Sequence, residues 1–164
     1  ERFQQINPVV KAPTLILDDG VVLMDSTLIL DYLEASCGKS LLPSDLKHRA
    51  QALRLIGLSL AACEKAVQLY YERNLRPADI QYQPWVERVE GQLAAAFTAL
   101  EKELEHSDLP VDGSLAQTGI SLAVAWSFTE LVIPDQIDAT RFPRIAEYTA
   151  YAEGTDAFIS TPMN

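Results

Sequence analysis

The sequence has few cysteines, few basic residues and few histidines. Cys37 and Cys63 are too few and too far apart for a disulfide framework, so we expect a reducing compartment, the cytoplasm. His48 and His106 show no spacing typical of metal ligands, and no metal site is expected. The 13 basic residues are outnumbered by 23 acidic ones, giving a net charge of −10. This balance argues against nucleic acid or an anionic membrane as a partner.

Long apolar runs are also missing. No stretch has the roughly 20 consecutive apolar residues that a membrane-spanning helix needs. The 48% hydrophobic and 22% charged residues are an ordinary balance for a globular protein. The 164 residues suffice for one large or two small domains. Composition therefore gives a class of protein, and function has to be sought in local motifs.

The most informative motif is a predicted β-hairpin. An apolar run over residues 14–17 and another over 21–24 are joined by Asp18-Asp19-Gly20, and two such runs joined by Asp-Gly are a strong hairpin signal. Pro13 opens the first run, a position that a strand tolerates. The first run does not alternate with polar residues, so we expect that strand to be covered on both faces and to lie inside its sheet.

Helices are predicted on both sides of the hairpin. Residues 27–36 carry apolar side chains at helical spacing. Ser26 is the expected N-cap of this helix, since its hydroxyl can accept a hydrogen bond from a first-turn amide, and Gly38 is the expected C-terminal stop. Residues 2–6 look like the last turns of another helix, which ends before Asn7-Pro8. One hairpin with one helix is marginal in water, so this first domain is expected to be incomplete.

The stretch from Asn7 to Leu33 resembles the second half of the glutathione-binding, thioredoxin-like domain of the glutathione transferase family. The resemblance implies an α+β fold. Residues 1–38 would be an incomplete thioredoxin-like domain, 39–45 a linker and 46–164 an all-helical domain. The family's catalytic Ser, Tyr or Cys would lie upstream of residue 1, so no residue of this sequence is given that role. Family members are usually homodimers, and a dimer is expected here.

The resemblance also implies a glutathione site, with glutathione as a substrate and no metal. Ala12-Pro13 takes the place of the family's cis-proline dipeptide, in which the first residue offers its backbone to the cysteinyl part of glutathione. Asp25-Ser26 matches the acidic-Ser pair that holds the γ-glutamyl end, and Lys11 is placed to reach the glycyl carboxylate. By itself Asp25-Ser26 is more often an ordinary helix cap, but the hairpin and the spacing favour the ligand.

The remainder of the chain is predicted to be helical. Two amphipathic stripes recur at three- and four-residue spacing: Leu53, Ile56, Leu60, Cys63, Val67 and Tyr70, then Val86, Val89, Leu93, Phe97, Leu100 and Leu104. Residues 120–132 are apolar on most sides, which is typical of a central helix. A shorter helix is expected over 142–151. Glu101, Glu103 and Glu105 are interpreted as a solvated helix face.

Two details of these helices are predicted from the family pattern. The central helix usually begins with a Ser/Thr-x-x-Asp box, and here the aligned residues are Ala116 to Gly119, which lack both capping side chains. We therefore expect a shifted or frayed start. Tyr70 and Tyr71 end the first long helix, which in the family lines the pocket for the electrophile. They are candidates for an apolar co-substrate site, although packing between helices explains them equally well.

The resulting hypothesis is a bacterial-type cytosolic glutathione transferase that adds the glutathione thiolate to an apolar electrophile. Two alternatives remain. One is a non-catalytic binding or protein-interaction protein on the same scaffold, since a fold does not determine a function. The other is a glutathione-dependent reductase or dehalogenase of the same family, which the catalytic residue alone would distinguish.

Overall fold

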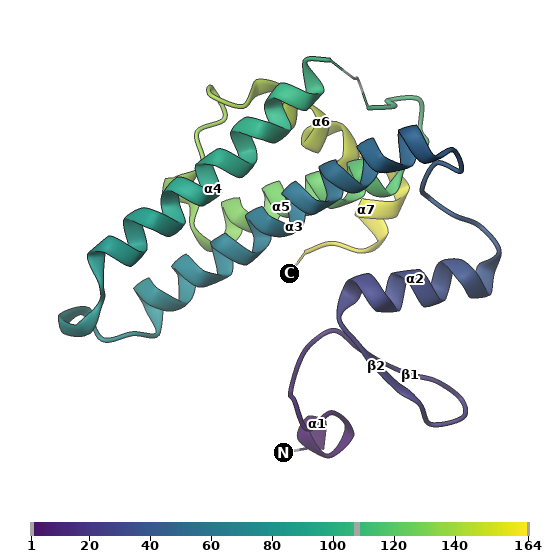
Figure 1. The fold of residues 1–164 in the computed structure, drawn as a ribbon, viewed down its shortest axis with the longest axis horizontal. Helices are drawn as coiled ribbons and strands as arrows, with labels where there is room; N and C mark the ends of the chain where they lie inside the picture. Colours follow the sequence, from purple (N-terminus) through teal and green to yellow (C-terminus); the bar gives the residue numbers. More distant parts are fainter. Residues whose placement is uncertain (1, 107–108, 164) are drawn as a thin grey trace. The chain divides into compact units, whose positions relative to one another are not determined.

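The computed structural model describes residues 2–106 and 109–163, and the chain divides into two compact units, Glu1–Leu41 and Leu42–Asn164. The elements of the first unit are α1 (Arg2–Ile6), β1 (Thr14–Ile16), β2 (Val22–Met24) and α2 (Ser26–Cys37). Those of the second are α3 (Leu46–Asn74), η1 (Ala78–Ile80), α4 (Gln83–Leu104), α5 (Gln117–Val132), η2 (Pro134–Gln136), α6 (Pro143–Glu153) and α7 (Asp156–Ser160). Figure 1 labels the α-helices and strands.

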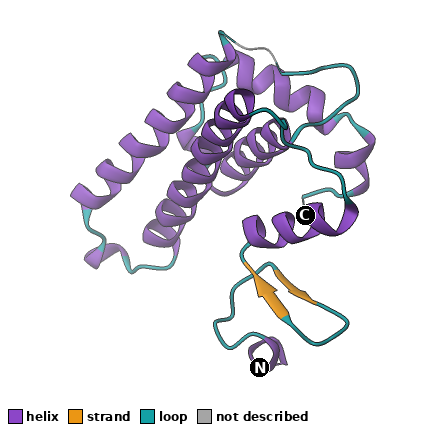
Figure 2. Cartoon of the chain, turned by 45° about the vertical axis from the view of Figure 1, so that its right-hand side comes forward, coloured by secondary structure: helices purple, strands orange, loops and turns teal. Residues whose placement is uncertain are grey.

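The predicted hairpin is confirmed. β1 and β2 pair antiparallel, with Leu15 opposite Leu23 and Ile16 opposite Val22 (Figure 2). Gly20 in the connecting turn has a φ of 88°, a left-handed conformation that glycine adopts without steric penalty. The turn residue thus determines where the chain reverses.

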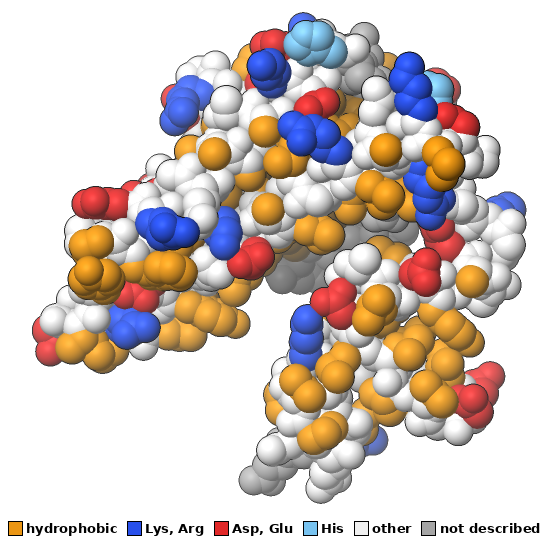
Figure 3. Space-filling view, in the orientation of Figure 1, with side chains coloured by type: hydrophobic (Ala, Val, Ile, Leu, Met, Phe, Trp, Pro, Cys, Tyr) orange, Lys and Arg blue, Asp and Glu red, His pale blue; other side chains and the backbone are white. Residues whose placement is uncertain are grey.

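The predicted burial of the first strand on both faces is wrong for the described residues. Leu15 and Leu23 are half-buried, whereas Ile16 is 52% exposed and Val22 39% exposed. Alternate side chains of a strand point to opposite faces, and α2 packs against the two strands that the described part of this unit contains. Hydrophobic side chains therefore gather on the surface of this unit (Figure 3).

The second unit is a bundle of helices. α3 and α4 lie side by side and antiparallel, and α5 packs against α3 and α6 (Figure 1). The predicted stripe of α4 is confirmed, because all six of its residues are buried. At the centre, the Trp126 ring meets Phe97 at 5.4 Å and Phe142 at 6.1 Å between ring centroids. These aromatic edge contacts join α5, α4 and the segment that leads into α6.

The predicted apolar stripe of α3 is displaced by one position. Its larger members are partly exposed, with Leu53 at 50% and Leu60 at 43%. The buried face consists instead of small residues, one leucine and one glutamate near the end of the helix: Ala52, Ser59, Ala62, Ala66, Leu69 and Glu72. α3 packs against both α4 and α5, and small side chains let helix backbones approach closely. Periodicity alone could not distinguish the two adjacent faces.

The start of α5 corrects another prediction. Ala116 is the N-cap, and the amide of Ile120 donates to its carbonyl oxygen at 3.1 Å. The helix thus begins where the family's capping box would place it, although no side chain caps it, so the predicted shift is wrong. Gly119 lies in this first turn. The absence of a Cβ there leaves room for the Tyr148 ring, whose hydroxyl oxygen would stand 1.9 Å from an added Cβ.

The predicted solvated face of three glutamates is wrong for two of them. The Glu101 carboxylate accepts hydrogen bonds from the backbone amides of Arg144, at 2.9 Å, and Ile145, at 3.1 Å. Glu101 therefore caps the N-terminus of α6 from another helix, since first-turn amides have no partner within their own helix. Glu103 accepts from Arg54 Nε at 2.6 Å and ties α4 to α3.

Candidate functional site

The loop that leads into the hairpin is organised by Asn7. Its side chain is 2% exposed, and its Nδ2 donates to Lys11 O at 3.1 Å and to Thr14 Oγ1 at 2.8 Å. The Asn7 Oδ1 accepts from the amide of Val9 at 3.1 Å. Nδ2 also lies 3.6 Å from the sulfur of Met24 at the end of β2. The loop is thereby held against the residue that immediately precedes Asp25.

Sequence reasoning did not identify Asn7 as a functional residue. It interpreted Asn7-Pro8 as the end of a helix, which the structure confirms for α1. Asn7 organises the loop because its side chain is buried, and a buried amide must find partners for its donors and acceptor. An Asn between a helix end and a proline gives no signal of which carbonyl it will bind.

Ala12 and Pro13 are joined by a cis peptide bond, as the resemblance implies. Ala12 is exposed. Within residues 2–106 and 109–163, no hydrogen bond joins the backbone of Ala12 to another residue. Its N–H and C=O groups are therefore available to a peptide-like ligand. Such a contact needs no particular side chain.

Asp25, and not Ser26, is the N-cap of α2. The Asp25 backbone has φ 73° and ψ 121°, outside the helical region, and its Oδ1 accepts from the amide of Thr27 at 3.0 Å. Ser26 is already the first helical residue, so the predicted cap was displaced by one position. This leaves the exposed Ser26 hydroxyl without a hydrogen-bond partner in the described part of the chain.

The structure brings Lys11 and Asp25 together. Lys11 Nζ lies 2.8 Å from Asp25 Oδ2, although the two residues are 14 positions apart. The hydrogen bond from Lys11, and after it the amide of Thr27, lower the pKa of the Asp25 carboxyl. Asp25 is therefore an anion near neutral pH. A cation, an anion and the free backbone of Ala12 thus lie within a short segment of the first unit.

Tyr70 and Tyr71 belong to the second unit. Their rings lie 6.2 Å apart between centroids, and their side chains are 37% and 56% exposed. Neither is part of the helical core. A groove of about 470 Å³ is lined by Gln68, Tyr71, Glu72, Leu75, Arg76, Pro77 and Trp85. Tyr71 therefore lines an open groove with both polar and apolar walls, Tyr70 is not among the lining residues, and the electrophile role of either tyrosine stays a prediction.

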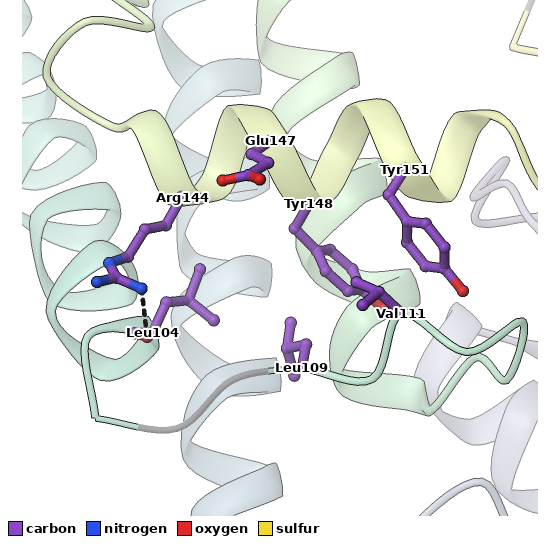
Figure 4. Close-up of a pocket in the computed structure, with 7 residues that line it drawn as sticks. All are labelled: Leu104, Leu109, Val111, Arg144, Glu147, Tyr148 and Tyr151. Atoms are coloured by element: carbon purple, nitrogen blue, oxygen red, sulfur yellow. Dashed lines mark hydrogen bonds between the residues drawn. The ribbon is translucent and has the colours of Figure 1, made fainter.

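A second cavity of the helical unit has a volume of about 440 Å³ (Figure 4). It is lined by Leu104, Leu109, Val111, Arg144, Glu147, Tyr148 and Tyr151. Burial raises the pKa of the Tyr148 hydroxyl, which is packed over Gly119 without a hydrogen-bond partner. Tyr151 accepts from the amide of Gly113 at 2.7 Å. Of the two hydroxyls, that of Tyr151 is thus bonded to the protein's own backbone, and the cavity wall is mainly apolar.

Two sequence comparisons concern the hairpin segment and the chain as a whole. A sequence model described as "Glutathione S-transferase, N-terminal domain" matches residues 1–40. Glutathione S-transferase theta-2 of Rattus norvegicus is 30% identical over 166 residues, a match that covers 99% of this chain and 67% of that protein. The chain belongs to the glutathione S-transferase family.

Three solved structures share the fold. A family member from Pseudomonas fluorescens Pf-5, solved with bound glutathione, is 27% identical with a TM-score of 0.88, covering 99% of this chain and 78% of its own. A possible glutathione S-transferase from Rhodopseudomonas palustris is 27% identical with a TM-score of 0.72, covering 99% and 73%. Maleylpyruvate isomerase from Pseudomonas aeruginosa PAO1 is 25% identical with a TM-score of 0.69, covering 90% and 77%. The predicted α+β class, a thioredoxin-like part before a helical domain, is confirmed.

Residues 2–106 and 109–163 of this glutathione transferase family member contain neither a metal-binding cluster nor a membrane-spanning helix. No cluster of three or more His, Cys, Asp or Glu side chains could hold a metal ion there. No helix in those residues has the length and apolar character needed to cross a membrane. Cys37 is exposed at the end of α2, and Cys63 is half-buried, where burial raises the pKa of its thiol.

Proposed function

We propose that this protein is a glutathione transferase that joins the glutathione thiolate to a small electrophile. The observation that carries the proposal is the pairing of Lys11 with Asp25 at the start of α2, next to the exposed Ala12 backbone. Such a segment suits a zwitterionic tripeptide with charges at both ends. Family membership, and the glutathione bound in the Pseudomonas fluorescens relative, support this function.

Each part of glutathione has a counterpart in this segment. The α-ammonium of the γ-glutamyl end would bind Asp25. Its α-carboxylate would bind the Ser26 hydroxyl and the first amides of α2, because a helix N-terminus favours an anion. The backbone of Ala12, held by the cis bond to Pro13, would pair with the cysteinyl residue. Lys11 would bind the glycyl carboxylate.

The proposed reaction uses glutathione held in this way. The bound thiol loses its proton, and the thiolate sulfur forms a bond to the electrophilic carbon while a leaving group departs with the electron pair of its own bond. A lower thiol pKa would supply more nucleophile near neutral pH. No residue of this sequence is assigned the role of stabilising the thiolate. Tyr70 or Tyr71 would contact the apolar electrophile.

The oligomeric state, the localisation and the two alternative functions are also proposals. A homodimer in the cytoplasm fits the family and the small number of cysteines. The reductase or dehalogenase alternative would use the same glutathione site with a different catalytic side chain. A non-catalytic binding protein would keep the fold without needing that side chain. Exposed charges at the Lys11–Asp25 segment favour a ligand-binding role over purely structural use of the scaffold.

The test is calorimetric titration of glutathione into the protein and two variants. Ser26→Ala removes a hydroxyl from the proposed site, and Ser36→Ala is the matched control at the other end of α2, where the hydroxyl donates to Leu33 O. Loss of a hydrogen bond to a charged group is expected to weaken binding by roughly 10-fold. Ser36→Ala should bind as the wild type does. Absence of glutathione binding to the wild type, or equal affinities for both variants, would contradict the site.

Catalysis is tested separately with 1-chloro-2,4-dinitrobenzene, whose conjugate with glutathione absorbs light. Glutathione binding with conjugation of this aryl halide would support the transferase. Binding without conjugation, but with reduction of a mixed disulfide, would favour the reductase alternative. Binding without either reaction would favour the non-catalytic alternative.

A further inference from the structure

The Lys11–Asp25 ion pair lies at the place proposed for glutathione. Lys11 Nζ and Asp25 Oδ2 are 2.8 Å apart, and their side chains are 51% and 41% exposed. Asp25 Oδ1 is already used by the Thr27 amide. The Lys11 ammonium group thus holds Asp25 Oδ2, so the ligand's ammonium group would meet a like charge at this carboxylate.

The position of Lys11 is set by its backbone. Its carbonyl oxygen accepts from Asn7 Nδ2 at 3.1 Å and from Thr14 Oγ1 at 2.7 Å. The Lys11 side chain can move while its backbone stays fixed, since lysine carries a compact charged group on a flexible four-carbon stem. Lys11 can therefore leave Asp25 without any rearrangement of the loop.

A ligand that brings only an ammonium group exchanges one ion pair for another. It forms an ion pair with Asp25 and breaks the ion pair between Asp25 and Lys11. A ligand that also carries a carboxylate within reach of Lys11 replaces one ion pair with two. In a protein with a net charge of −10, an unpaired Asp25 would attract cations of many kinds, and pairing with Lys11 would weaken that attraction.

We propose that Lys11 is a specificity-determining residue, which neutralises Asp25 in the free protein and so makes binding depend on both charged ends of the ligand. The proposal rests on the proposed function, because it concerns the same glutathione site. It goes further by assigning the preference for a ligand with an ammonium at one end and a carboxylate at the other to the exchange of this ion pair.

The test compares glutathione with its glycyl ethyl ester, which lacks the glycyl carboxylate. Calorimetric titrations use the wild type, Lys11→Met, Lys11→Arg and the control Lys39→Met, an exposed lysine beyond the end of α2. Lys11→Met is expected to weaken glutathione binding and to strengthen ester binding, each by about two- to fivefold, as for an exposed ion pair. Lys11→Arg should keep the wild-type preference, and Lys39→Met should change neither affinity.

The opposite signs of the two effects make the result decisive. A lysine that merely contacts the glycyl carboxylate, without competing for Asp25, would leave ester affinity unchanged in Lys11→Met. A lysine that only maintains the fold would weaken both ligands equally. Either result overturns the exchange while glutathione still binds the wild type. If neither ligand binds the wild type or Lys39→Met, the proposed function itself fails, and the exchange fails with it.

Discussion

Gly119 is expected to resist substitution because Tyr148 occupies the space beside it. A Cβ on Gly119 would lie 1.9 Å from Tyr148 Oη, 2.6 Å from Cζ and 2.9 Å from Cε1. The ring is buried, with 6% of the residue exposed, and packs against Tyr151 at 5.7 Å between centroids. Gly119→Ala therefore forces the ring or the first turn of α5 to move.

The magnitude is the balance of two opposing terms. Overpacking of a well-filled core typically costs about 1–3 kcal/mol. Replacing glycine by alanine inside a helix returns up to about 1 kcal/mol, and less in the first turn. We expect Gly119→Ala to lower the free energy of unfolding by about 1–2 kcal/mol. Gly119→Asp, which restores the acidic residue of the family's capping box, should be at least as destabilising despite the favourable helix dipole.

The assay is urea denaturation followed by far-ultraviolet circular dichroism, with an internal control. Gly57 and Gly91 lie within α3 and α4, and a Cβ added at either position would have no heavy atom within 4 Å apart from the adjacent residues and the helix's own nearby backbone. Gly57→Ala and Gly91→Ala should therefore stabilise the protein by up to about 1 kcal/mol. The sign of the effect should thus reverse between these two glycines and Gly119.

A double-mutant cycle assigns the cause to Tyr148. Combining Gly119→Ala with Tyr148→Leu should recover at least about 1 kcal/mol relative to the sum of the single variants, because the colliding ring is gone. Stabilisation by Gly119→Ala alone, of the size seen at Gly91, would refute the steric argument. A cycle with no coupling energy would refute the role of Tyr148.

Three further predictions concern the cap of α6, the loop before the hairpin and the charge of the site. Glu101→Ala should lower the free energy of unfolding by about 1–2 kcal/mol through loss of the α6 cap, measured by urea denaturation; a loss as small as that of the exposed Glu105→Ala would contradict it. Val10 has φ 56°, which disfavours a β-branched side chain, so Val10→Asn should slow amide hydrogen exchange in the first unit; faster exchange would argue against strain. The lowered pKa of Asp25 means that its stabilising contribution is present above its ordinary value of 3.8 and is lost as pH falls through the lower folded value. The difference in stability between wild type and Asp25→Asn should therefore be constant near neutral pH and shrink below pH 3.8; a difference that grows on acidification would reverse this sign.

Local signals in the sequence were sufficient for the elements that carry the site. The Asp-Gly turn predicted the hairpin, and Gly38, with φ 65°, ends α2 as expected. The stripe of α4 identified its buried face because its large apolar side chains occupy a single side of the helix. The equivalent reasoning misplaced the face of α3, where alanines provide the close contacts and leucines lie on the neighbouring side.

Of the candidate site, the sequence supplied the residues but not their pairing. Lys11, Ala12, Pro13, Asp25 and Ser26 were selected because they match the family's motif, and their role in binding stays a prediction. The contact between Lys11 and Asp25 depends on how the loop folds back onto the end of β2. The displacement of the helix cap from the serine to the aspartate is a change of one residue, which pattern reasoning does not resolve because both side chains are good caps.

The sequence by itself determined the order of hairpin and helices, the turn and the stop of α2. Those features depend on conformational preferences and spacing within a few residues. The tertiary structure decided that Glu101 caps α6 more than 40 residues away, that Tyr148 fills the space above Gly119, and that Asn7 is buried. Each of these requires two segments to meet, and such meetings are set by the packing of the whole unit, because a single side chain gives no indication of its distant partner.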